Sequence, residues 1–348
     1  GQPATPAPAA VRAAAHRALD DQRLGYTMAN GIPALRERIA AHYRRVYDLV
    51  VSPSEVVVTT GSSGAFLLTF LAAFDAGDVV AVARPGYPAY RNLLTSLGCE
   101  VRELPCDAST RFQPTLAILE GLDPRPSGLV LASPANPTGT MVPPAELAAI
   151  ATWCANHGVR LISDEIYHGI TYTGVAASAW QSDRHAVVIN SFSKYFSMTG
   201  WRLGWLLAPA DLLDPIDRLA SNFALCPPTL AQLAAVHAFD DYPELDANVA
   251  RYRTNRDVLL DGLRSLGLDR LAPADGAFYA YADVSAFTDD ALTFCRRMLT
   301  EAGVATTPGV DFDSVDGNRF LRASFAGAES VVSGALDALA GWLPGQRR

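Results

Sequence analysis

Short strand patterns alternate with helix patterns along the first part of the sequence, and this alternation restricts the fold more than any other feature. Each strand pattern is a run of apolar and β-branched residues, and helical spacing follows most of these runs. The sequence therefore predicts an α/β fold, with a mostly parallel sheet covered by helices on both faces. Strands are expected at 55–60, 78–83, 101–104, 128–132, 160–163, 186–190 and 203–207.

Polar turns follow five of the predicted strands. The carboxyl ends of parallel strands meet at one edge of a sheet, and ligands of such sheets bind there. We therefore expect the five turns to form one site. They lie at 61–64, 84–88, 133–139, 164–167 and 191–194.

The pattern changes after about residue 240. A long polar helix is expected at 244–266, followed by short strands at 278–283 and 320–323 and by two further helices. The sequence predicts two domains, a large one that contains the ligand site and a smaller α+β one. The large domain is expected to span 14–240, and the small domain to combine 1–13 with 241–348.

The overall charge and the cysteines exclude several classes of protein. A net charge of −8 and a pI near 5.2 leave no basic surface for nucleic acid. No apolar run reaches the roughly 18 residues of a membrane helix. The five cysteines are odd in number and scattered, which favours reduced thiols over disulfides or a zinc site. We expect a cytoplasmic protein without a metal, and an upstream segment before Gly1.

Lys194 is the only lysine in 348 residues. The chain has 28 lysines and arginines together, so 27 (28 − 1) are arginines. Unlike a guanidinium, an ammonium can lose its proton at accessible pH and form a Schiff base with a carbonyl group. Lys194 is therefore the predicted nucleophile.

The turn at 61–64 resembles an anion site at the start of a helix, with the hydroxyls of Ser62 and Ser63 beside free backbone N–H groups. It matches neither G-x-G-x-x-G nor a P-loop. It differs by one residue from the G-x-S-x-G motif of α/β-hydrolases, so a serine hydrolase that uses Ser63 remains an alternative.

Four motifs in this order make the chain resemble the class I/II aminotransferases of the aspartate aminotransferase superfamily, which are fold type I pyridoxal phosphate enzymes. The resemblance extends from Gly1 to about Ala326. It implies transamination between an L-amino acid and a 2-oxo acid, with pyridoxal phosphate as cofactor. The motifs are Asn136-Pro-Thr-Gly139, Asp164-Glu-Ile-Tyr167, Lys194 and Arg202.

The resemblance also implies a role for each cofactor-binding residue. Lys194 matches the lysine that holds the cofactor as a Schiff base and then moves a proton at the substrate. Asp164 matches the carboxylate that keeps the pyridine nitrogen protonated, although it could equally cap a helix. Asn136 and Tyr167 match the pair that bonds the phenolic oxygen of the cofactor. Tyr87 matches the aromatic residue stacked on its ring.

The same resemblance implies which residues bind the phosphate of the cofactor and which one reaches a partner subunit. Tyr90 is close enough in sequence to compete with Tyr87 for the stacking position. Tyr26 matches the tyrosine that reaches the phosphate of the neighbouring subunit, which implies a homodimer with shared sites. The residues expected around the phosphate of the same subunit are Ser62, Ser63, Ser191, Ser193 and Arg202.

The substrate side rests on three residues. Arg322 matches the arginine that binds the substrate α-carboxylate, with Arg319 as a nearby competitor. Gly1 and Asn136 match positions that lie against the substrate.

In the branch of the superfamily that this sequence most resembles, aspartate-using members bind the distal carboxylate with a lysine at the position of Ser63. This chain has no lysine there, so we expect neutral amino donors such as valine or alanine. An arginine such as Arg84, or an arginine of the other subunit, could replace that lysine, which leaves an aspartate aminotransferase as an alternative. A pyridoxal phosphate β-lyase or decarboxylase, and a non-catalytic sensor, remain further alternatives.

Overall fold

Seven strands form the large sheet of the computed structural model, which describes residues 1–21 and 23–347. Gln22 and Arg348, which the two predicted domains include, lie outside the described residues. The strand order is β1-β7-β6-β5-β4-β2-β3. The strands are β1 (Val56–Thr59), β2 (Val79–Arg84), β3 (Glu100–Pro105), β4 (Gly128–Ala132), β5 (Arg160–Asp164), β6 (Val187–Ser191) and β7 (Gly204–Leu207).

The sheet is mostly parallel, as predicted. β3, β2, β4, β5 and β6 run in one direction, while β7 is antiparallel to both β6 and β1. β1 consequently points the same way as β6, and its carboxyl end lies on the common edge. The connection between β6 and β7 contains no α-helix that could cross over the sheet, so β7 returns antiparallel.

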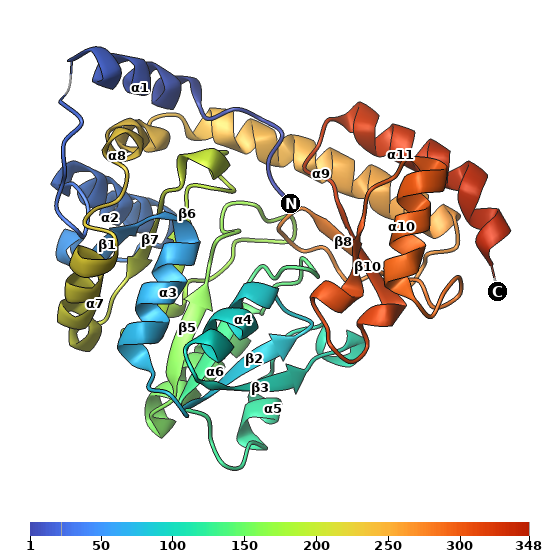
Figure 1. The fold of residues 1–348 in the computed structure, drawn as a ribbon, viewed down its shortest axis with the longest axis horizontal. Helices are drawn as coiled ribbons and strands as arrows, with labels where there is room; N and C mark the ends of the chain where they lie inside the picture. The colour runs from blue at the N-terminus through green and yellow to red at the C-terminus, as the bar shows by residue number, and fades with distance from the viewer. Residues whose placement is uncertain (22, 348) are drawn as a thin grey trace.

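Helices cover both faces of this sheet (Figure 1). Successive side chains of a strand point to opposite faces, so in β4 Leu129 and Leu131 pack in one apolar cluster and Val130 in another. The first cluster includes α2 (Pro33–Tyr47) and α6 (Pro144–His157). The second includes α3 (Gly61–Ala73), α4 (Pro88–Ser96) and α7 (Ala210–Phe223). Three further helices are α1 (Ala9–Asp21), α5 (Leu116–Glu120) and α8 (Thr229–Ala235), and α1 packs on α8.

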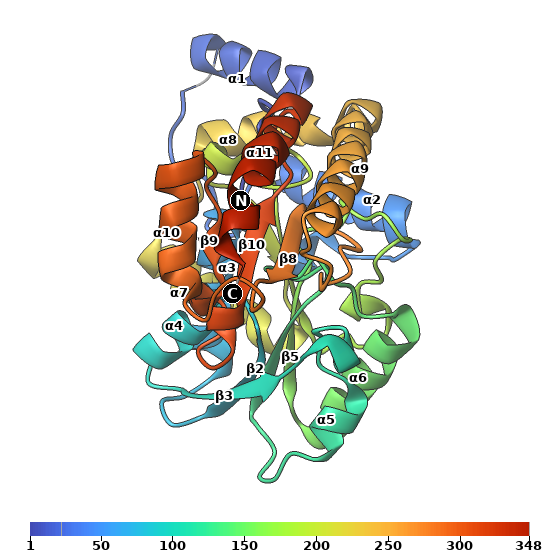
Figure 2. The same cartoon turned by 90° about the vertical axis from the view of Figure 1, so that its right-hand side faces the viewer.

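A second, antiparallel sheet of three strands lies beside the large one, in the order β8-β10-β9 (Figure 2). Its strands are β8 (Tyr279–Asp283), β9 (Thr307–Pro308) and β10 (Phe320–Ser324). Three helices accompany it, α9 (Tyr242–Ser265), α10 (Ala291–Ala302) and α11 (Glu329–Trp342). The expected long helix and the two expected strands are therefore present. The proposed domain boundary at residue 240 stays a prediction.

Some local predictions were wrong. The predicted turn at 61–64 is instead the first turn of α3, which begins at Gly61, so Ser62 and Ser63 lie within the helix and not ahead of it. Helices α7 and α8 and the two-residue strand β9 were not anticipated. No helix in the described part of the chain is long and apolar enough to span a membrane.

Candidate active site

A cavity of ≈ 330 Å³ opens at the carboxyl edge of the large sheet, facing the small sheet. Residues from all five predicted turns or the helices that follow them line it. They are joined there by residues from the start of the chain, from the segment after Lys194 and from the small sheet. The predicted site residues that line the cavity are Gly1, Ser62, Ser63, Tyr87, Asn136, Asp164, Tyr167, Ser193, Lys194, Arg202 and Arg322.

Lys194 follows β6 and extends into the cavity. Its Nζ donates a hydrogen bond to the Gly1 carbonyl oxygen at 2.8 Å. Burial lowers the pKa of the Lys194 ammonium to about 8, and the charge of Arg322 acts in the same direction, while Asp164 opposes it. Near neutral pH, Lys194 is therefore the neutral, nucleophilic amine more often than an exposed lysine is.

Asp164 ends β5, and its side chain is only 4% exposed. Its carboxylate accepts hydrogen bonds from the Tyr90 hydroxyl and from the backbone N–H of Ile166, the latter at 3.0 Å. Burial raises the pKa of Asp164 to about 6, and these hydrogen bonds and Lys194 hold it below what burial alone would give. The bond to Ile166 lies in a turn rather than a helix, so Asp164 is not a helix cap.

One end of the cavity is suited to an anion. The first turn of α3, whose N–H groups have no partner within the helix, lies there with the hydroxyls of Ser62, Ser63 and Ser193. Arg202 supplies the positive charge. Gly61 has a φ of +69°, which other residues rarely adopt, and a Cβ there would lie 2.4 Å from Nη2 of Arg202 and displace that guanidinium.

The residues present therefore fit pyridoxal phosphate. The anion end suits its phosphate, Lys194 can form the covalent link, and Asp164 is a buried carboxylate suited to a protonated ring nitrogen. Asn136 and Tyr167 lie in the same cavity as Lys194, where they could reach a phenolic oxygen.

Two residues of the predicted cofactor set do not line the cavity. Ser191 is buried behind it, where its hydroxyl donates hydrogen bonds to Ser193 Oγ at 2.9 Å or to the Leu203 carbonyl oxygen at 3.1 Å. It therefore supports Ser193 rather than facing a ligand. Tyr26 is 84% exposed and lies outside the cavity of its own chain.

Arg322, on β10, lines the cavity from the small sheet. Nη1 donates to Asn136 Oδ1 at 2.7 Å and Nη2 to Thr307 Oγ1 at 3.2 Å. Its Nε is buried and has no hydrogen-bond partner among the described residues. The guanidinium lines the cavity, where it can meet a carboxylate. The competitor Arg319 pairs instead with Asp283 at 3.0 Å.

Arg84 does not line the cavity. Its guanidinium lies 3.4 Å from Asp313 and 3.6 Å from Asp316, both in the segment that precedes β10. Two carboxylates already neutralise this arginine, so it is not available to a substrate. The cations that line the cavity, among the described residues, are Lys194, Arg202 and Arg322.

The structure adds residues that the sequence predictions missed. Tyr279 lines the cavity, and its hydroxyl lies 2.7 Å from that of Tyr167. Tyr90 was expected only as a stacking residue, but its hydroxyl bonds Asp164. No histidine is among the described residues that line the cavity, so Ser63 lacks the base that a serine hydrolase needs.

Known proteins that this chain resembles are aminotransferases. The family model for aminotransferases of class I and II matches residues 1–339. A Mycobacterium tuberculosis protein named valine–pyruvate aminotransferase is 58% identical over 350 residues, which cover 99% of this chain and 90% of that protein. A solved aminotransferase structure from the same organism has a TM-score of 0.98 at 58% identity and covers 99% of this chain and 90% of that one. An aspartate/prephenate aminotransferase of Thermus thermophilus is 36% identical over 98% of this chain and 89% of its own.

Proposed function

The chain belongs to the class I and II aminotransferases, which use pyridoxal phosphate, and we propose that its amino donor is a neutral aliphatic amino acid such as valine or alanine. The proposed acceptor is pyruvate or another 2-oxo acid such as 2-oxoglutarate. The observation that carries the choice of donor is the set of cations in the cavity. Lys194, Arg202 and Arg322 each have a task in binding the cofactor or the α-carboxylate, so no cation among the described residues of the cavity remains for a second carboxylate.

The proposed roles of the side chains follow from their surroundings. When bound, pyridoxal phosphate supplies a carbonyl that joins amines and a ring that withdraws electrons from the substrate Cα. Lys194 holds the cofactor and then, as a free amine whose pKa burial lowers to about 8, moves a proton from Cα. Asp164 holds a proton on the ring nitrogen, and Asn136 and Tyr167 donate hydrogen bonds to the phenolic oxygen.

Arg322 orients the substrate. Its guanidinium lines the cavity and offers N–H groups to the α-carboxylate, and a forked contact of this kind fixes the direction of the Cα–H bond. An aliphatic side chain brings no charge into the cavity. The carboxylate of aspartate would be buried beside Ser63 and Tyr87 without a cation, which is costly.

The relatives support this choice of donor. The Mycobacterium tuberculosis protein at 58% identity is named for valine and pyruvate, whereas the Thermus thermophilus protein at 36% is named for aspartate and prephenate. Aspartate is therefore the second candidate donor.

We also propose a homodimer in which Tyr26 enters the site of the neighbouring subunit. Its side chain is 84% exposed and has no place in its own cavity, which suits a contact made across an interface. The cytoplasmic location stays a prediction.

A panel of amino donors and 2-oxo acids tests the substrate proposal with the cofactor-loaded enzyme. We expect kcat/KM for valine or alanine to exceed that for aspartate by at least about tenfold, roughly 1.4 kcal/mol in the transition state. Ser63→Lys should narrow that ratio. Aspartate as the best donor would refute the proposed substrate, and release of ammonia or carbon dioxide without an acceptor would instead indicate a lyase or a decarboxylase.

A further inference from the structure

Tyr279 contacts residues on both sides of the cavity, Arg322 on the small sheet and Tyr167 after a strand of the large sheet. It lies on β8, which pairs antiparallel with β10 so that Arg322 is opposite Tyr281 and Ser324 is opposite Tyr279. Residues opposite each other, and their diagonal neighbours two positions along, share one face of such a pair. Tyr279 is therefore a diagonal neighbour of Arg322 on the face of the small sheet that closes the cavity.

The ring of Tyr279 holds the guanidinium of Arg322 from one side. The guanidinium carbon lies 4.4 Å from the centroid of the Tyr279 ring and 4.7 Å from that of the Phe312 ring. Flat cationic groups are attracted to ring faces, so contact with two rings restricts the orientation of the group. This orientation sets the directions in which Arg322 can offer its N–H groups to a carboxylate.

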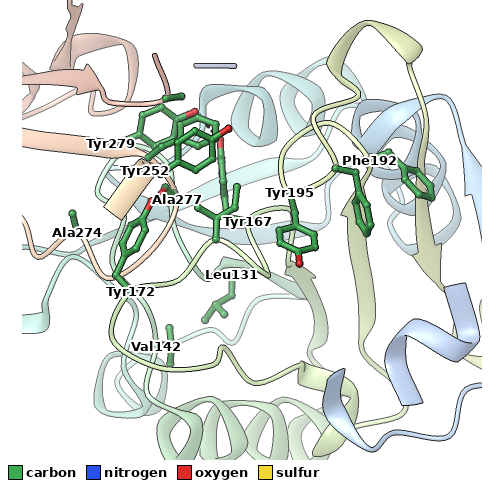
Figure 3. Packing of buried hydrophobic residues seen from close by; sticks show 14 of the residues in the cluster. Leu131, Val142, Tyr167, Tyr172, Phe192, Tyr195, Tyr252, Ala274, Ala277 and Tyr279 are labelled. Carbon is green, nitrogen blue, oxygen red and sulfur yellow. Dashed lines mark hydrogen bonds between the residues drawn. The ribbon is translucent and has the colours of Figure 1, made fainter. Parts of the chain in front are cut away.

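The hydroxyl of Tyr279 reaches the cofactor side of the cavity. It lies 2.7 Å from the Tyr167 hydroxyl, and both groups are buried (Figure 3). Either hydroxyl can be the donor in this pair. Tyr279 has a second acceptor, the Gly1 carbonyl oxygen, but at 3.5 Å it is distant. When Tyr279 donates to Tyr167, the hydrogen of Tyr167 is free to point into the cavity, and Tyr167 becomes a stronger donor.

We propose that Tyr279 is a positioning residue that acts through two neighbours. Its ring restricts the orientation of the Arg322 guanidinium, and its hydroxyl keeps the Tyr167 hydrogen directed toward the phenolic oxygen of the cofactor. One side chain thus aligns the substrate carboxylate with the cofactor. The inference rests on the proposed function, because both neighbours act on its ligands.

The conservative variant Tyr279→Phe keeps the ring and removes the hydroxyl. The measurement is the pH midpoint of the visible absorbance of the Lys194-bound cofactor, taken together with KM and kcat for valine and pyruvate. A hydrogen bond from Tyr167 reduces the negative charge of the phenolic oxygen, so the linked Lys194 nitrogen loses its proton more easily. A weakened bond should raise the midpoint by about half a pH unit or more. KM should stay within about twofold, because the ring is kept.

Tyr279→Leu removes the ring as well. It should raise the midpoint in the same way and also raise KM for both substrates at least about fivefold, because Arg322 loses one of its two ring contacts. Melting temperatures of both variants report on folding. If the leucine variant does not fold, the phenylalanine variant, which keeps the packing, decides the outcome through its midpoint.

Tyr281→Phe is the matched control. Tyr281 lies two residues further on the same strand, is equally buried, and its hydroxyl has no hydrogen-bond partner among the described residues. Its variant should keep the wild-type midpoint and KM. An absorbance midpoint that is unchanged in Tyr279→Phe would overturn the inference. The proposed function would still stand if the wild type carries the cofactor absorbance and catalyses transamination. A wild type that binds no cofactor at Lys194 would overturn both.

Discussion

Removal of the Tyr90 hydroxyl should move the acid limb of the activity profile. Tyr90 donates a hydrogen bond to a buried carboxylate oxygen of Asp164, and its ring packs 5.0 Å from that of Phe66 and 5.4 Å from that of Tyr87. Tyr90→Phe keeps these ring contacts, so the fold should be retained. Only the hydrogen bond to the carboxylate is lost.

The size of the effect follows from the charge of the acceptor. A hydrogen bond to a charged group contributes about 1.5–3 kcal/mol, and about 1.36 kcal/mol corresponds to one pH unit in a pKa. The pKa of Asp164, raised to about 6 by burial in the wild type, should therefore rise by about one to two pH units in the variant. A positive charge on the bound cofactor would lower the pKa of Asp164 in the wild type and in Tyr90→Phe alike, so the difference between the two proteins would remain.

The sign of the prediction follows from the protonation state of Asp164. Protonated Asp164 cannot hold a proton on the ring nitrogen, so activity falls as the pH drops through its pKa. A higher pKa moves this loss to higher pH. Tyr90→Phe should therefore lose about tenfold or more of kcat/KM on the acid side and approach wild-type activity at high pH.

The assay is kcat/KM for valine and pyruvate from about pH 5.5 to about pH 9.5, compared with Tyr87→Phe. Tyr87 also lines the cavity, but its hydroxyl bonds no described residue, so its loss should leave the acid limb in place. Asp164→Asn, by contrast, should lower kcat at every pH. A loss in Tyr90→Phe that is the same at all pH values would refute the reasoning.

Three further predictions concern Lys194, Glu165 and Arg84. Lys194→Arg should bind cofactor weakly and show no transamination, and borohydride should fix no cofactor onto the chain; normal turnover would exclude Lys194 as the attachment site. Burial raises the pKa of Glu165 to about 8 from its usual 4.5, so its contribution to stability decreases as pH rises between these values. The free energy of unfolding, measured by urea denaturation, should therefore become more favourable to Glu165→Gln relative to the wild type as the pH rises from about 5 to about 8. The difference between the two proteins should grow by at most about 1.4 kcal/mol per pH unit. A difference that does not change with pH would contradict this prediction. Arg84→Gln should change the valine-to-aspartate ratio of kcat/KM by less than about twofold, because Asp313 already pairs this arginine; a large change would identify Arg84 as a substrate contact.

The edge of the sheet and the residues placed there could be predicted because they depend on local patterns. The turns after β4, β5 and β6 follow directly from strand ends, so the strand pattern alone is enough to bring Asn136, Asp164 and Lys194 together. Lys194 also stands out by composition, since a chain with one lysine and many arginines marks that position without any knowledge of its neighbours.

The remaining contacts depend on pairings between distant segments. Tyr279 lies beside Arg322 only because β8 and β10 pair in one register, and Arg84 is neutralised by Asp313 from a segment far along the chain. Tyr90 reaches Asp164 from the first turn of α4, and the inward direction of Ser191 depends on how its strand ends. No local pattern contains this information.

The division of the cavity between the two sheets has a consequence for synthesis of the protein. All seven strands of the large sheet lie between Val56 and Leu207, and so do the residues proposed to hold the cofactor on the same chain. Tyr279 and Arg322 follow much later. If the predicted large domain folds as a unit during synthesis, its cofactor-binding edge can form while the substrate-binding segment is still being translated. Pyridoxal phosphate that bound at this stage would stabilise the half-made chain by mass action, so the supply of cofactor in the cell would govern the yield of folded protein as well as its activity.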